Sequence, residues 1–73
     1  MTVALYLTKG GKDGARVRRY VTSLGDESWS WIGAWGACSG TRETVLRRLR
    51  EALARHHGWT AAVPLPPEWE SGR

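Results

Sequence analysis

The sequence predicts an α+β domain in which a three-stranded antiparallel sheet (β-β-β-α order) packs on one C-terminal amphipathic helix, followed by an extended, proline-rich tail. Three segments in the first half of the chain alternate in polarity with the period of two that is typical of strands. Residues 42–57 instead repeat apolar side chains at spacings of three and four, as a helix does. All three prolines come later, which predicts a compact domain over residues 1–58 and an extended arm over residues 59–73.

The first strand is predicted over residues 2–8, where Val3, Leu5 and Leu7 share one side. Residues 9–14 contain three glycines and an Asp-Gly step. Because glycine adopts positive φ at little cost, this segment predicts a hairpin turn. The first strand is therefore expected to lie at the edge of a simple meander.

The second strand is predicted over residues 15–24, where β-branched and aromatic residues are interleaved with arginines. Arg19 shares one side of this strand with two valines. Arg16, Arg18 and Tyr20 lie on the other side. The alternation therefore predicts a strand with one strongly basic side.

The third strand is predicted over residues 29–38, after a turn at residues 25–28. It places Trp29, Trp31 and Trp35 in one stripe, and two glycines weaken or bulge the strand. One helix covers only one face of a sheet, so the stripe is either core under the helix or an exposed binding patch. Side-chain volume favours the core, at least for Trp31.

The helix is predicted over residues 42–57, with Thr41 as its N-cap and Gly58 directly after its end. Its apolar arc must cover one face of the sheet, which gives a two-layer domain. The arc consists of Val45, Leu46, Leu49, Ala52, Leu53 and His56.

The composition favours a binding protein over an enzyme. A chain of 73 residues buries only about 60% of the surface that its unfolded form exposes, so few side chains remain to wall a deep active-site cleft. The net charge is +4, and nine of the eleven basic residues are arginine. Arginine binds phosphates and carboxylates through paired hydrogen bonds. An anionic partner is therefore expected.

A cytoplasmic location is predicted. A single cysteine, Cys38, excludes an internal disulfide and suits a reducing compartment. Residues 1–8 are apolar, but they lack a basic leader and are too short to span a bilayer. No membrane contact is expected, and the oligomeric state stays open.

No catalytic residue, metal ion or cofactor is predicted. His56 and His57 are adjacent in the sequence, so on a helix they point about 100° apart and do not chelate one metal ion alone. The glycine-rich run at residues 9–14 lacks the Gly-Lys-Ser/Thr ending of a phosphate-binding loop.

Three candidate contact surfaces for a partner remain. The first strand has no charge and no proline to protect its free edge, so a partner strand is expected to add there. The arginines of the second strand either bind phosphates or an acidic protein patch, or are simply solvated. The arm offers a third surface near Trp69, while Trp59 and Val63 are expected to pack back on the domain. The predicted contact residues are Val3, Leu5, Tyr6, Leu7, Arg16, Arg18, Arg19, Tyr20 and Trp69.

Two family resemblances rest on the helical segment. The run GTRETVLRRLREALARH resembles the last helix of the DNA-binding arm domain of phage-type integrases, which has three strands and a helix. This resemblance implies a small basic module that binds DNA or RNA. Residues 40–53 are also similar to the helix of HicB-like antitoxins, which implies binding to a ribonuclease toxin.

A third resemblance concerns the whole chain. Its length of 73 residues, its arginine, alanine and tryptophan content, and its compact body with a C-terminal arm resemble small regulators encoded by lytic phages of xanthomonads. That resemblance implies binding to subunits of the host RNA polymerase in the bacterial cytoplasm, inhibition of transcription initiation, and antitermination. We take a polymerase-binding regulator as the predicted function, with the nucleic-acid-binding module and the antitoxin as alternatives.

Overall fold

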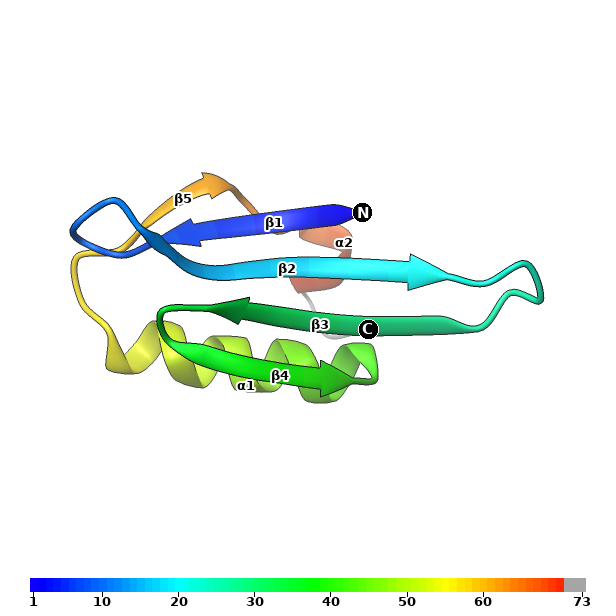
Figure 1. Ribbon diagram of the computed structural model, residues 1–73. Helices are drawn as coiled ribbons and strands as arrows, with labels where there is room; N and C mark the ends of the chain where they lie inside the picture. Colours follow the sequence, from blue (N-terminus) through cyan, green and yellow to red (C-terminus); the bar gives the residue numbers. More distant parts are fainter. Residues whose placement is uncertain (71–73) are drawn as a thin grey trace.

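The structure, a computed structural model, describes residues 1–70 as a five-stranded antiparallel sheet with a helix along one face (Figure 1). The strand order is β4-β3-β2-β1-β5, so β4 and β5 form the two edges. The α+β class is confirmed, whereas the predicted number of three strands is wrong. The elements are β1 (Thr2–Leu7), β2 (Asp13–Val21), β3 (Glu27–Gly33), β4 (Gly36–Gly40), α1 (Arg42–Arg55), β5 (Thr60–Val63) and α2 (Pro67–Glu70).

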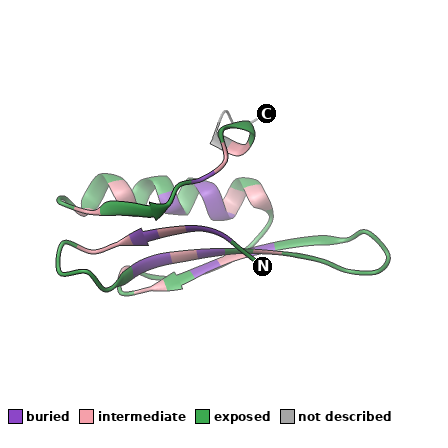
Figure 2. Ribbon diagram, turned by 90° about the horizontal axis from the view of Figure 1, so that it is seen from above, coloured by how far each residue is buried: buried purple, intermediate pink, exposed green. Residues whose placement is uncertain are grey.

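The sheet buries the face that is turned toward α1. On this face the register aligns Ala4 of β1 with Val17 of β2, and Val17 with Trp31 of β3. Buried positions gather where the sheet and α1 face each other (Figure 2). Trp29 and Trp31 are only 1% and 4% exposed, so these two tryptophans are core. The buried residues are Val3, Ala4, Tyr6, Ala15, Val17, Trp29, Trp31, Val45, Leu46, Leu49, Ala52 and Leu65.

The segment predicted as one third strand is a hairpin. β3 ends at Gly33 and β4 begins at Gly36, and these two glycines pair across a two-residue turn. A Cβ at Gly33 would collide with the carbonyl group of Gly14, so glycine is required where β3 passes the start of β2. The expectation of one strand over residues 29–38 is therefore wrong, because its glycines mark a chain reversal and not a bulge.

Trp35 leaves the predicted tryptophan stripe because it lies in this turn. Its indole occupies the space where a side chain at Gly14 would project. It also stacks on the ring of His56, with ring centroids 5.0 Å apart and planes 7° apart. The stack joins the β3–β4 turn to the C-terminal end of α1.

The helix α1 begins at the predicted N-cap, where the Thr41 hydroxyl accepts a hydrogen bond from the backbone N–H of Thr44 at 3.3 Å. It ends at Arg55, two residues before the predicted end. His56 is the C-cap, with an extended backbone whose N–H donates to the carbonyl of Ala52. Gly58, with φ of +77°, lies in the turn that leads to β5.

The arm predicted over residues 59–73 contains a strand. β5 pairs antiparallel with β1, with Val63 opposite Leu5 and Thr60 opposite Leu7. The expectation of an extended, proline-rich arm is therefore corrected in part, because residues 60–63 form a strand of the sheet and residues 67–70 a short helix, while residues 71–73 lie outside the described part. β1 becomes an inner strand as a result.

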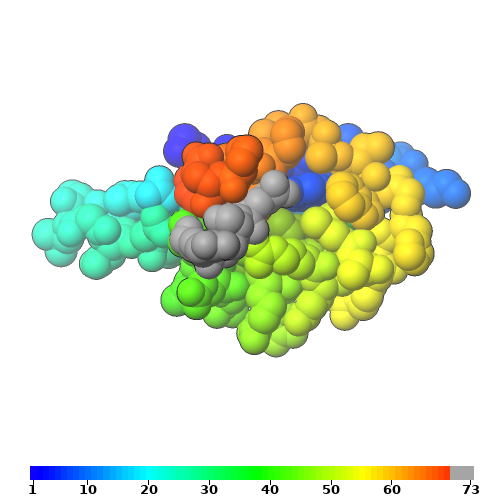
Figure 3. Space-filling view, turned by 180° about the vertical axis from the view of Figure 1, so that it is seen from behind, coloured from blue at the N-terminus to red at the C-terminus, as the bar shows by residue number. Residues whose placement is uncertain are grey.

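The described part of the arm also packs against the core. Leu65 is only 7% exposed. The ring of Trp69 stands edge-on to that of Trp29, with centroids 5.0 Å apart and an angle of 89°. Figure 3 shows this segment, in orange and red, lying against the body of the molecule. Trp69 is therefore partly buried, although the sequence placed it beyond the core.

Replacing Trp29 by alanine is expected to destabilise the domain by about 3–5 kcal/mol, because the change leaves a cavity under α1. Ile32 lies on the other face of the sheet and is 59% exposed. Ile32→Ala is therefore expected to cost less than about 0.5 kcal/mol. Urea denaturation followed by circular dichroism measures both changes. Equal losses of stability would contradict the assignment of the buried face.

Candidate nucleic-acid interface

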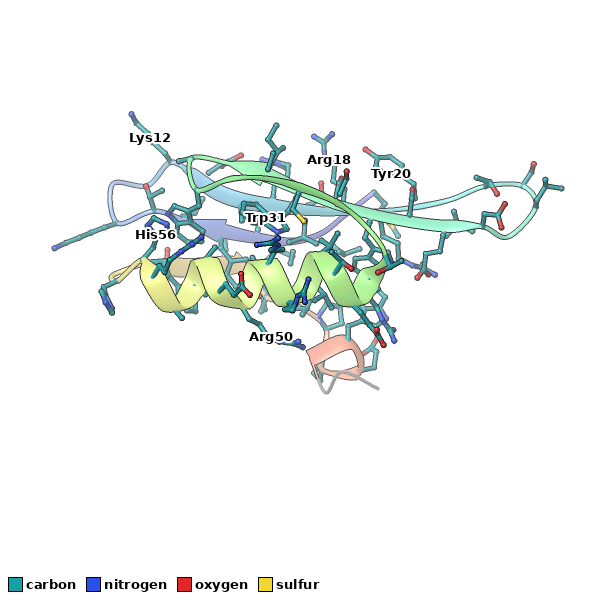
Figure 4. The ribbon with its side chains drawn as sticks, turned by 90° about the horizontal axis from the view of Figure 1, so that it is seen from below. Lys12, Arg18, Tyr20, Trp31, Arg50 and His56 are labelled. Carbon is teal, nitrogen blue, oxygen red and sulfur yellow. The ribbon has the colours of Figure 1, made fainter. Side chains whose placement is uncertain are left out.

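One face of the sheet is turned away from α1, and we call it the open face. Figure 4 shows the side chains of Arg18 and Tyr20 pointing to this side, whereas Trp31 lies between the sheet and α1. No helix covers the open face within residues 1–70. From the strand register, its residues are Leu5, Arg16, Arg18, Tyr20, Ser28, Ser30, Ile32, Ala37 and Ser39.

Four of the predicted contact residues lie on the open face, namely Leu5 of β1, which is aligned with Arg16, and Arg16, Arg18 and Tyr20 of β2. Arg16, Arg18 and Tyr20 follow one another along β2 at the strand period of two. An Arg18 guanidinium nitrogen lies 3.4 Å from the Tyr20 hydroxyl, and no carboxylate side chain among residues 1–69 forms an ion pair with Arg18. Arg16 pairs with Asp13 at 2.8 Å, but such an exposed pair contributes little to stability. These two guanidinium groups are therefore available to an anion.

A shallow hollow of about 420 Å³ lies over β3 and β4. It forms because Ser30 is paired with Ser39 across the two strands, and both side chains are small. Arg18 is aligned with Ser30, so β2 brings this arginine next to the strand that lines the hollow. Hydroxyls and guanidinium groups are the donors that proteins use to bind phosphate and sugar oxygens. The lining consists of Ser30, Trp31, Ile32, Ala37, Cys38 and Ser39.

Arg19 lies on the opposite side of β2 from Arg16 and Arg18. Its side chain pairs with Glu27 at 2.6 Å, and its guanidinium lies 5.7 Å from the ring centroid of Trp69. The structure therefore separates Arg19 from the other two arginines. Arg19 and Trp69, two predicted contact residues, here contact each other and the core.

Glu27 is held by two donors at once. The indole N–H of Trp29 donates to one carboxylate oxygen at 2.7 Å, and the Arg19 side chain donates to the other at 2.7 Å. The hydrogen bond from Trp29 and then the one from Arg19 stabilise the charged form, so the pKa of Glu27 is lowered. Through Glu27, these hydrogen bonds link Arg19 of β2 to the beginning of β3.

The prediction of a free edge at β1 is wrong. β1 lies between β2 and β5, and β5 pairs with its Leu5–Leu7 part. Val3 and Tyr6 are buried, and the Tyr6 hydroxyl accepts a hydrogen bond from the backbone N–H of Leu65 at 3.4 Å. Leu5 and Leu7 are half-buried. A partner strand therefore cannot add along Leu5–Leu7 of β1, because β5 occupies that position.

Sequence reasoning missed several residues of the open face. Alternation along the strand puts Ser30 and Ile32 on the side opposite Trp29 and Trp31, which is a usable signal in the sequence. Ala37 and Ser39 gave no such signal, because their strand was not recognised. A turn between β2 and β3 was expected, but the way this hairpin projects beyond the sheet was not (Figure 1), and Leu24 at its tip is 88% exposed.

Comparison of the chain with protein-family models, curated proteins and solved structures finds no match. Where side chains are described, over residues 1–69, no three His, Cys, Asp or Glu residues come together in a way that could hold a metal ion. No helix in that range has the length and apolar character needed to cross a membrane. The three family resemblances and the cytoplasmic location stay predictions.

Replacing Glu27 by glutamine is expected to lower stability at neutral pH but not in acid. The pKa of Glu27 in the folded state is below that in the unfolded chain, about 4.3 for glutamate. Its contribution is therefore present above the unfolded value and is lost as the pH falls through the folded value. The urea midpoints of wild type and Glu27→Gln should differ at neutral pH and converge in acid. A pH-independent difference would contradict the two-donor arrangement.

Proposed function

We propose that this chain is a non-enzymatic protein that binds nucleic acid through the open face of its sheet. The observation that supports this function is the grouping of Arg16, Arg18 and Tyr20 on one exposed surface, beside a hollow bordered by serine hydroxyls. Arginine binds phosphate bidentately, and an exposed tyrosine ring stacks on an unpaired base. Tyr20 is 47% exposed, so its ring is available for such stacking.

The spacing of these side chains suits a strand of nucleic acid. Alternate residues of a β-strand are about 7 Å apart, so Arg16 and Arg18 can each meet a different phosphate group. Tyr20 continues the same row toward the projecting hairpin. Because Tyr20 contributes through a ring face, the arrangement favours single strands, whose bases are free to stack. The net charge of +4 adds long-range attraction.

Replacing Arg18 by glutamine is expected to weaken binding of a single-stranded oligonucleotide and to make it less sensitive to salt. Losing one phosphate contact should flatten the slope of log K against log salt concentration by about 0.7. Fluorescence anisotropy over a salt series measures both quantities. Arg47→Gln, which removes the same charge from the exposed side of α1, is the matched control and should leave the slope unchanged. Equal effects of both variants would show attraction by net charge alone.

Replacing Tyr20 by serine is expected to reduce the affinity for a single-stranded oligonucleotide by about 1–3 kcal/mol, because one base loses its stacking surface. The salt slope should not change, because no phosphate contact is lost. The same titration with a duplex of identical sequence is the comparison. A larger loss on the duplex than on the single strand would argue against stacking.

A polymerase-binding regulator or an antitoxin would bind a protein instead of nucleic acid. The salt dependence of binding and its sensitivity to nuclease distinguish these two functions from the proposed one. Nucleic-acid binding depends steeply on salt, whereas contacts between proteins depend on it much less. A pull-down from bacterial lysate at moderate salt, with and without nuclease, makes the distinction. Loss of all partners on nuclease treatment supports the open-face proposal. Polymerase subunits or a small ribonuclease that remain bound would support the regulator or the antitoxin.

A further inference from the structure

A groove of about 450 Å³ runs between the edge strand β4 and α1. Its strand wall is formed by β4, and Trp31 also lines it. Figure 4 looks onto this edge, with Trp31 between the strand and the helix. The helix wall follows one stripe of α1 at spacings of four, three and four residues, which brings its side chains onto one face. These side chains belong to Thr44, Arg48, Glu51 and Arg55.

The backbone of β4 offers unused hydrogen-bonding groups. β4 pairs only with β3 within residues 1–70, and it carries no charge and no proline that would block a further strand. Gly36 is paired with Gly33 at the turn, and hydrogen-bonded pairs alternate along an antiparallel ladder. Ala37 and Ser39 therefore turn their N–H and C=O groups outward, toward the groove side of the edge.

The other edge strand is less suited to pairing. β5 is followed directly by Pro64, which has no N–H to donate. Its register with β1 is also irregular between Leu5 and Tyr6. β4 keeps a regular register with β3 from Gly36 to Gly40.

The side chains of the helix wall favour a ligand that carries negative charge. Arg48 and Glu51 are 3.6 Å apart, and both side chains are about half exposed, so this pair is easily exchanged for another. Arg55 has no ion-pair partner among the side chains described for residues 1–69. The wall thus carries two guanidinium groups against one carboxylate.

Trp31 lines the same groove, although its side chain is only 4% exposed. Its indole nitrogen is buried and has no hydrogen-bond partner among residues 1–69. Because that nitrogen is itself buried, the groups that a peptide in the groove meets first are the edge of β4 and the arginines of the helix wall.

We infer that β4 and α1 together bind an extended segment of another protein, which adds as a strand along β4 and carries acidic side chains at alternate positions. Side chains of a strand alternate between its two faces, so one set would face Arg48 and Arg55 and the other set would continue the open face. A second copy of this chain fits less well, since pairing of two β4 edges would bring the two sets of arginines together. This site is separate from the open face and does not rest on nucleic-acid binding.

The test uses the full chain labelled with ¹⁵N and a short peptide of alternating valine and glutamate. Saturable shifts are expected at the amides of Ala37 and Ser39, along the groove face of α1, and at the indole N–H of Trp31. A peptide of alternating valine and lysine is the matched control and should cause no such shifts. Absence of saturable shifts with the glutamate peptide at millimolar concentration would overturn the proposal, as would equal binding of the two peptides.

Two variants separate the backbone contribution from the charge contribution. Ser39→Pro removes an outward N–H without touching the pairing with β3, and it should weaken binding of the glutamate peptide about tenfold. Ser39→Ala keeps that N–H and should bind as wild type does. Arg55→Glu should reverse the preference toward the lysine peptide, whereas Arg47→Glu, at a position of α1 that does not line the groove, should not.

The same samples show whether the groove instead binds a second copy of this chain or an oligonucleotide. Self-association in sedimentation experiments that is lost in Ser39→Pro would assign the edge to a second copy and overturn the proposal. An oligonucleotide that displaces the peptide, and whose binding is lost in Arg55→Glu but kept in Arg18→Gln, would assign the groove to nucleic acid. If peptide binding is normal while the open face binds no oligonucleotide, only the proposed nucleic-acid function fails.

Discussion

A sheet has two faces, and the described part of this chain has only one long helix to cover them. The buried side takes the large apolar groups, above all Trp29 and Trp31 under α1. The other side must stay compatible with water, so arginine and serine alternate there with a few apolar residues. Because only one face is covered by a helix, the core lies on that face, and the arginines of the other face are exposed to a ligand. The same arrangement leaves strand edges open.

The sequence predicted the elements whose signals are local. The first two strands, the helix and its Thr41 cap all follow from alternation, helical spacing and capping chemistry. The β3–β4 hairpin was missed because its turn, Ala34 and Trp35, contains none of the usual Asn-Gly or Asp-Gly steps. β5 was missed because its four residues are short and alanine-rich, and pairing with β1 defines the strand more than its own propensity does.

The candidate site was predictable in part for the same reason. Alternation alone grouped Arg16, Arg18 and Tyr20, and the structure places them on one exposed face. The identity of the edge strands depends on the order of all five strands, which no local signal carries. The expected strand addition at β1 was wrong on this point. The physical argument that an uncharged edge attracts a strand is still useful, because β5 satisfies it within the chain and β4 presents the same kind of edge to a partner.

The place of β5 also has a consequence for the synthesis of this protein on the ribosome. β1 is made first, but the strand that closes its outer edge comes more than fifty residues later. A nascent chain that stops before residue 60 can form the β1–β2 hairpin, yet its first strand still has an uncharged, unpaired side. In the unfinished chain β1 is therefore the unprotected sheet edge that the sequence suggested. Pairing with β5 protects this edge once the chain is complete.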